Sequence, residues 1–207
     1  MLGDFINSMK KLWGGSSDGS FNIKVSQKAL KNLAPGRTII FKNLPEIIYN
    51  SLIGKTLDID KLQFEVKLEI QYNEEGFAYK EFKLEEEGME FWLEVIRDMG
   101  TWTLSLWKRM PELKQNLYLK SGKVVKSLVY ENQTYKLDET GIANFNMLDE
   151  ENPQKGTIKY WRFQCEEDPK KVFAVTDWME SEQYECAVGE WIREKDFEIL
   201  VFSASFQ

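Results

Sequence analysis

The chain has 207 residues, a formal net charge of −7, 43% hydrophobic residues and 14% aromatic residues. This apolar content predicts a globular protein with a sizeable core and excludes a disordered chain. The sequence contains no histidine, which excludes Ser–His–Asp triads, imidazole metal ligands and proton transfer by histidine. Two cysteines are too few for a disulfide scaffold or an all-cysteine zinc site.

The charge is unevenly distributed along the chain. Residues 1–60 have a net charge of +3, whereas residues 61–207 have a net charge of −10. The acidic body repels phosphates, so we expect no nucleic-acid partner. The sequence has no run of 18 apolar residues, so we expect no transmembrane helix. Asp4, Asn7 and Lys10 interrupt the apolar residues near the N-terminus, so we expect no secretory signal there. We therefore expect a cytoplasmic protein, possessing thiols rather than a disulfide.

The first 20 residues predict an amphipathic helix and a linker. Residues 1–13 place their apolar side chains on one stripe of a helix, and residues 14–20 form a flexible stretch rich in glycine and serine. A helix of this length is marginal in isolation, so it must dock on its own domain, on a protein partner or on a membrane surface. The candidate binding residues of this helix are Phe5, Ile6, Met9 and Trp13.

The segment from residue 21 to residue 61 gives weaker signals. Ser26 is a candidate N-cap for a short helix ending at Leu33, and residues 38–42 predict a strand. Pro45 opens either a helical turn or a loop, and these alternatives stay open for residues 44–60.

From Leu62 onward, hydrophobic and polar residues alternate with a period of two, which is typical of half-buried strands. Acidic and glycine-containing turns separate the strands, as in antiparallel meanders. We predict a mainly β protein with two antiparallel meander halves, 21–118 and 119–207, each barrel-like or sandwich-like and packed against the other. The predicted strands are 62–71, 77–84, 90–95, 101–107, 124–130, 134–137, 141–148, 156–165, 172–178, 184–188 and 197–202.

Trp107 is a fifth candidate binding residue. Trp102, Leu104 and Leu106 share one face of the predicted strand 101–107, which places Trp107 on the opposite face. We therefore expect Trp107 to be exposed or to cover a sheet edge. An exposed tryptophan can mark a binding surface, which makes Trp107 a candidate binding residue.

Aromatic, glycine and acidic motifs recur through the β-rich part of the chain. They are 79–84 (YKEFKL), Trp92-Leu93, Trp102, 135–143 (YKLDETGIA), Tyr160-Trp161, Trp178 and 185–189 (ECAVG). In these motifs the chain resembles a bacterial family called domain of unknown function 4178 (DUF4178), over about residues 62–200. The resemblance implies the fold of that family and brings no established activity, cofactor or site residue. It also implies an association with genes for membrane stress and polyamines, which favours a role at a membrane.

The other candidate motifs favour ordinary structural roles. Gly54-Lys55-Thr56 resembles the end of a phosphate-binding loop, but Tyr49 occupies the position where that motif requires glycine. Cys165 and Cys186 have acidic neighbours and no histidine to activate them, so we expect two unreactive thiols. Consecutive carboxylates at 85–87, 149–151 and 166–168 are typical of solvated turns, so we expect no metal and no cofactor.

These patterns predict a non-catalytic binding or scaffold protein, whose N-terminal helix docks on a membrane surface or on a protein partner. Two alternatives stay open. One is an enzyme that uses carboxylates or lysines in a cleft between the two β halves. The other is a carrier that encloses a small ligand in an aromatic-lined barrel.

Overall fold

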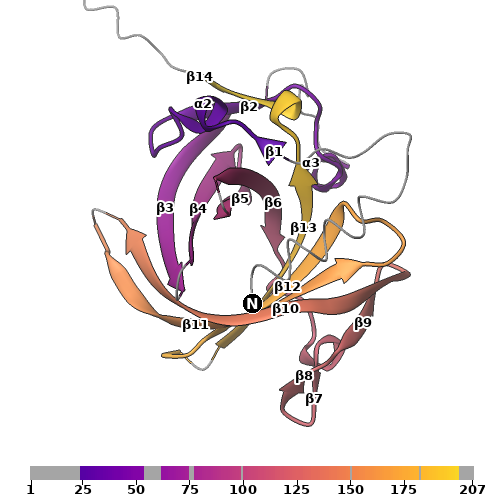
Figure 1. The fold of residues 1–207 in the computed structure, drawn as a ribbon. Helices are drawn as coiled ribbons and strands as arrows, with labels where there is room; N and C mark the ends of the chain where they lie inside the picture. The colour runs from indigo at the N-terminus through magenta and orange to yellow at the C-terminus, as the bar shows by residue number, and fades with distance from the viewer. Residues whose placement is uncertain are drawn as a thin grey trace, which may run out of the picture.

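A computed structural model describes residues 24–53, 62–74, 77–98, 100–149, 151–181 and 183–200 of the chain (Figure 1). The predicted helix at residues 1–13, the linker at 14–20 and the motif Gly54-Lys55-Thr56 lie outside these residues.

Eight antiparallel strands form a closed barrel. Two four-stranded meanders, β3–β6 and β10–β13, meet where β6 pairs with β13 and where β3 pairs with β10. The predicted mainly β, barrel-like architecture is confirmed, and each meander supplies half of one barrel. The barrel strands are β3 (Phe64–Glu74), β4 (Phe77–Glu86), β5 (Met89–Asp98), β6 (Thr101–Arg109), β10 (Gln133–Leu148), β11 (Gln154–Cys165), β12 (Lys171–Trp178) and β13 (Gln183–Ile192).

Shorter elements cover the outside of the barrel, with α2, β1, β2 and β14 on one side and β7–β9 on another (Figure 1). β1 pairs with β6, β2 pairs with both β3 and β14, and β9 extends the sheet beyond β10. These elements are β1 (Lys24–Val25), α2 (Gln27–Leu30), β2 (Thr38–Phe41), α3 (Glu46–Leu52), η2 (Gln115–Leu117), β7 (Leu119–Lys120), β8 (Lys123–Val124), β9 (Ser127–Tyr130), η3 (Glu194–Asp196) and β14 (Phe197–Leu200).

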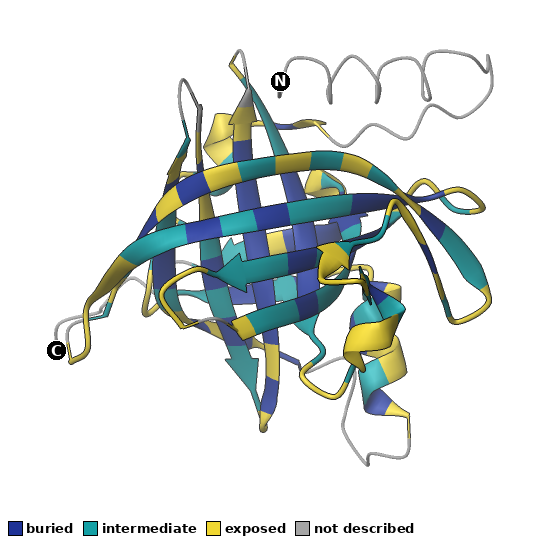
Figure 2. Ribbon diagram, turned by 90° about the horizontal axis from the view of Figure 1, so that it is seen from below, coloured by how far each residue is buried: buried dark blue, intermediate teal, exposed yellow. Residues whose placement is uncertain are grey.

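The hydrophobic residues form three cores. All eight barrel strands contribute to the inner core, which fills the barrel. The first outer core packs β3–β6 against α3, β2 and β14, and the second packs β10–β13 against residues 110–130. Buried residues therefore run along both faces of many barrel strands, as Figure 2 shows.

Burial on both faces overturns the prediction for Trp107. The alternation assigned its face correctly, because Trp107 lies opposite Leu104 and Leu106. However, that face lines the barrel, and Trp107 is only 5% exposed. The expectation of an exposed tryptophan at this position is therefore wrong.

The predicted strands 134–137 and 141–148 are one continuous strand, β10. A register shift between Leu137 and Glu139 bends it, so that its first residues pair with β9 and its last residues pair with β3. Gly141 is required within this strand, because a Cβ atom there would lie 2.4 Å from the Tyr160 hydroxyl oxygen.

Local signals explain both short helices. The Ser26 side chain accepts a hydrogen bond from the backbone of Ala29, as predicted for an N-cap, although α2 ends at Leu30 rather than Leu33. Pro45 precedes α3, so the helical alternative is correct for residues 46–52, whereas residues 54–60 lie outside the described part of the chain.

Candidate functional site

The inner face of the barrel combines aromatic rings with charged groups. Three glutamates and two arginines line a small cavity together with tyrosine and tryptophan rings. The charged residues are Glu81, Glu94, Glu185, Arg109 and Arg162.

Glu94 and Arg162 form a buried ion pair in this interior. The Arg162 guanidinium donates two hydrogen bonds to the Glu94 carboxylate, one of them over 2.8 Å, and Glu94 is only 1% exposed. Ser105 Oγ also donates to Glu94 over 2.8 Å, and it accepts a hydrogen bond from Trp107 Nε1. Burial opposes the charge of Arg162, but Glu94 and Glu139 outweigh it and raise the pKa of the guanidinium well above its usual range. Such a paired, hydrogen-bonded charge fits a structural role.

In a second interior cluster, the Arg109 guanidinium lies close to two carboxylates, those of Glu185 and Glu81. Arg109 lies 3.0 Å from Glu185 and 3.8 Å from Glu81, and its guanidinium carbon is 3.6 Å from the centre of the Trp92 ring. The Tyr72 hydroxyl donates to Glu81 over 2.9 Å. Burial raises the pKa of Glu81 to about 7 and raises that of Glu185, although Arg109 opposes both shifts. Glu81 therefore changes charge near neutral pH.

The interior leaves little space for a ligand. Its cavity measures about 40 Å³, which is close to the volume of one water molecule in the liquid. Pockets that enclose organic ligands typically measure about 300–1,000 Å³. The aromatic and charged side chains thus fill the barrel as its core and leave no space for an organic ligand.

Neither cysteine is arranged for nucleophilic chemistry. Cys165 and Cys186 are both 2% exposed, lie in the second outer core and are free thiols. Burial raises the pKa of both thiols, that of Cys186 to about 12, so the thiolate form is disfavoured.

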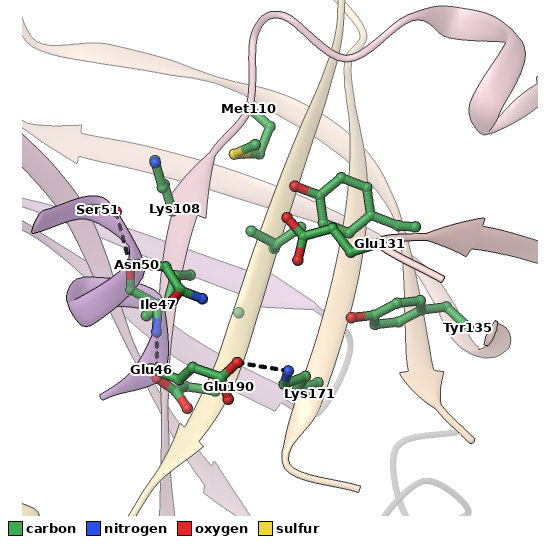
Figure 3. A pocket seen from close by; sticks show the side chains of 13 residues that line it. Glu46, Ile47, Asn50, Ser51, Lys108, Met110, Glu131, Tyr135, Lys171 and Glu190 are labelled. Carbon is green, nitrogen blue, oxygen red and sulfur yellow. Dashed lines mark hydrogen bonds and ion pairs between the residues drawn. The ribbon is translucent and has the colours of Figure 1, made fainter. Parts of the chain in front are cut away.

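A groove of about 200 Å³ lies on the outer wall of the barrel, between α3 and the turn that joins β9 to β10 (Figure 3). Its walls come from segments of both predicted halves of the chain. The lining residues are Glu46, Ile47, Asn50, Ser51, Lys108, Met110, Tyr130, Glu131, Tyr135, Lys171, Val188, Gly189 and Glu190.

The helix α3, which forms one wall of the groove, is fixed to the barrel by its buried side chains and by hydrogen bonds. Ile48 and Leu52 are buried in the first outer core. The Ile47 backbone N–H donates to Glu190 over 3.0 Å, and Lys171 donates to Glu46 over 2.9 Å. These bonds hold the helix against β12 and β13, so the groove is a preformed feature of the fold.

The opposite wall is a tight hairpin turn. Glu131 and Asn132, between the predicted strands 124–130 and 134–137, have φ values of 48° and 60°, as a two-residue type I′ turn requires. Burial raises the pKa of Tyr130 to about 12, with a further contribution from Glu131, and burial also raises the pKa of Tyr135. The tyrosine hydroxyls therefore remain protonated and can donate hydrogen bonds.

Two charges in the groove, those of Lys108 and Glu190, are not fully compensated by other protein groups. Among the residues that the structure describes, no carboxylate lies within 4.0 Å of the Lys108 ammonium. Burial raises the pKa of Glu190, because the Ile47 N–H and the nearby Lys171 compensate its charge only in part. The groove can thus bind an anionic group at Lys108 and a cationic group at Glu190 at the same time.

These features define a closed eight-stranded antiparallel β-barrel with a filled interior and a polar groove on its outer wall. The sequence matches the family described as domain of unknown function (DUF4178) over residues 52–194, and the chain belongs to that family. No curated protein and no solved structure matches the chain. In the described part of the chain, no helix is long and apolar enough to span a bilayer.

The predicted site residues and the groove do not coincide. Trp107 lies inside the barrel, and Phe5, Ile6, Met9 and Trp13 lie outside the described residues. The groove residues were missed because they come together through strand pairings between distant segments, such as β6 with β13. No pattern local to these residues indicates that pairing.

Proposed function

We propose that the protein is a non-catalytic binding protein that holds a small polar ligand in the outer groove. The observation that supports this proposal most is the pair of incompletely compensated charges, Lys108 and Glu190, in a groove whose lining also includes the apolar side chains of Val188 and Met110. Binding pockets typically combine an apolar surface with a few polar groups that converge on the ligand.

Methyl NMR provides a direct test, because Met110 lines the groove. The full chain is labelled with 13C at the methionine methyl groups, and Met110→Leu assigns the reporter signal. A library of small charged compounds is then added at millimolar concentration. The proposal expects some compounds to shift the Met110 signal and to leave most other methionine signals unchanged. A library without effect on Met110 would refute it.

A carboxylate-dependent enzyme is the second candidate, since Glu190 is a desolvated carboxylate in a cleft between segments of both predicted halves. This candidate expects Glu190→Gln to abolish the turnover of a groove ligand. The binding proposal expects that a bound ligand is recovered unchanged after long incubation with the wild-type protein.

The N-terminal segment has a separate proposed role, supported by its sequence alone. Residues 1–13 place Phe5, Ile6, Met9 and Trp13 on one apolar stripe that requires burial, and we propose that they dock on a membrane surface or a protein partner. Co-sedimentation with anionic liposomes tests the membrane arm. The full chain should pellet more than a chain lacking residues 1–20, and equal pelleting would exclude membrane docking.

A further inference from the structure

We infer that the ligand of the outer groove is a small aliphatic zwitterion, an amino acid with its carboxylate at Lys108 and its ammonium group at Glu190. This inference rests on the binding function proposed above and specifies the chemical class of the ligand.

The strand register places Lys108 and Glu190 as diagonal neighbours on one face of the sheet. Lys108 on β6 faces Val188 on β13, and Glu190 lies two residues further along β13 on the same outer face. Such diagonal neighbours have Cα atoms roughly 7–8 Å apart. No ion pair within 4.0 Å joins Lys108 to Glu190, and both residues line the groove, so a ligand bound there can contact both charges.

The other lysine in the groove does not offer a competing anion site. Lys171 is neutralised by Glu46 at 2.9 Å, so Lys108 is the better partner for a carboxylate. Asn50 and the hydroxyl of Tyr135 line the same groove and can donate further hydrogen bonds.

Glu190 is the expected partner for the ammonium group of the ligand. Glu190 has a raised pKa because burial removes water from its carboxylate, and a bound cation would restore the lost stabilisation. Glu131 at the hairpin turn is another carboxylate in the lining of the groove. A ligand with two anionic or two cationic groups would leave one of these charges without a partner.

The size of the groove and its apolar lining residues limit the rest of the ligand. A volume of about 200 Å³ lies below the range typical of drug-sized ligands. Val188, Ile47 and Met110 contribute aliphatic surface to the lining of the groove. A short chain of methylene groups matches this surface, since polar atoms there would lose water without gaining partners.

The test compares three probes of similar shape: 4-aminobutyrate, butyrate and butylamine. Each is titrated into the methyl-labelled full chain while the Met110 signal is followed. The zwitterion should reach half-saturation at a concentration at least tenfold lower than either singly charged probe. Lys108→Met should reduce its affinity to that of butylamine, and Glu190→Gln should reduce it to that of butyrate. The matched controls are Lys123→Met and Glu151→Gln, at exposed positions outside the groove lining, and neither should change the binding.

The outcomes separate the two proposals. Equal affinity for the zwitterion and a singly charged probe would overturn the inference and leave the binding function standing. If neither these probes nor the compound library shifts the Met110 signal, both proposals fail. Glu190→Gln keeps an oxygen that can accept from the Ile47 N–H, so loss of binding in this variant reports on charge rather than on an altered α3.

Discussion

The buried pair of Glu94 and Arg162 gives the sharpest prediction about the fold. Glu94→Ala removes the main counter-charge of a guanidinium that is 12% exposed, and it leaves Ser105 without its acceptor. Breaking one partner of a buried ion pair typically costs about 3–5 kcal/mol. We expect Glu94→Ala to lower the free energy of unfolding by about 4 kcal/mol, a large part of the stability of an average domain.

Urea unfolding followed by tryptophan fluorescence measures this change, since Trp92 and Trp107 lie in the same interior. The double variant Glu94→Ala with Arg162→Met removes both charges and should recover at least half of the loss. An exposed pair serves as the control: Glu198→Ala breaks the contact with Lys42 and should cost less than about 1 kcal/mol. A loss below about 1 kcal/mol for Glu94→Ala would refute the reasoning, because it would mean that water or Glu139 already compensates Arg162.

Four further predictions concern titration, backbone conformation and packing. Glu81 binds its proton more tightly in the folded state, with a pKa of about 7 against 4.5, so its contribution to stability is present below pH 4.5 and lost as the pH rises through 7. The stability of the wild type relative to Glu81→Gln should therefore fall by about 3 kcal/mol between pH 4.5 and pH 8, and a flat difference would contradict the buried setting. Glu131→Gly relieves a left-handed backbone and should stabilise the protein by up to about 1 kcal/mol in the same urea assay, whereas destabilisation would mean that the side chain holds the turn. Gly141→Ala should cost about 1–3 kcal/mol, since its Cβ would collide with Tyr160, and a neutral effect would disprove the close contact. Cys186 should react with iodoacetamide only as fast as the protein opens, and rapid labelling of the folded protein would contradict its burial and raised pKa.

The sequence was most informative where local periodicity decides the structure. The alternation from Leu62 onward predicted the strands of both meanders, and the acidic turn residues marked the hairpins. For Trp107 the same alternation gave the correct face and the wrong exposure. Whether an inner or an outer face is buried depends on closure of the barrel, and closure depends on the pairings of β3 with β10 and β6 with β13.

The groove could not be predicted for the same reason. The contact between Ile47 and Glu190 joins residues 143 positions apart, and that between Glu46 and Lys171 joins residues 125 positions apart. Isolated lysines and glutamates on strands are ordinary surface residues in a sequence. They define a site only after β13 is placed between β6 and β12 and α3 packs beside it.

A crystal structure of the full chain grown with 4-aminobutyrate tests the central claim most directly. The binding account predicts one molecule in the outer groove, with its carboxylate within hydrogen-bonding distance of Lys108 and its ammonium group at Glu190. It also predicts that the barrel interior contains no probe molecule. A probe bound inside the barrel, or an empty groove at concentrations that saturate the protein in solution, would contradict it.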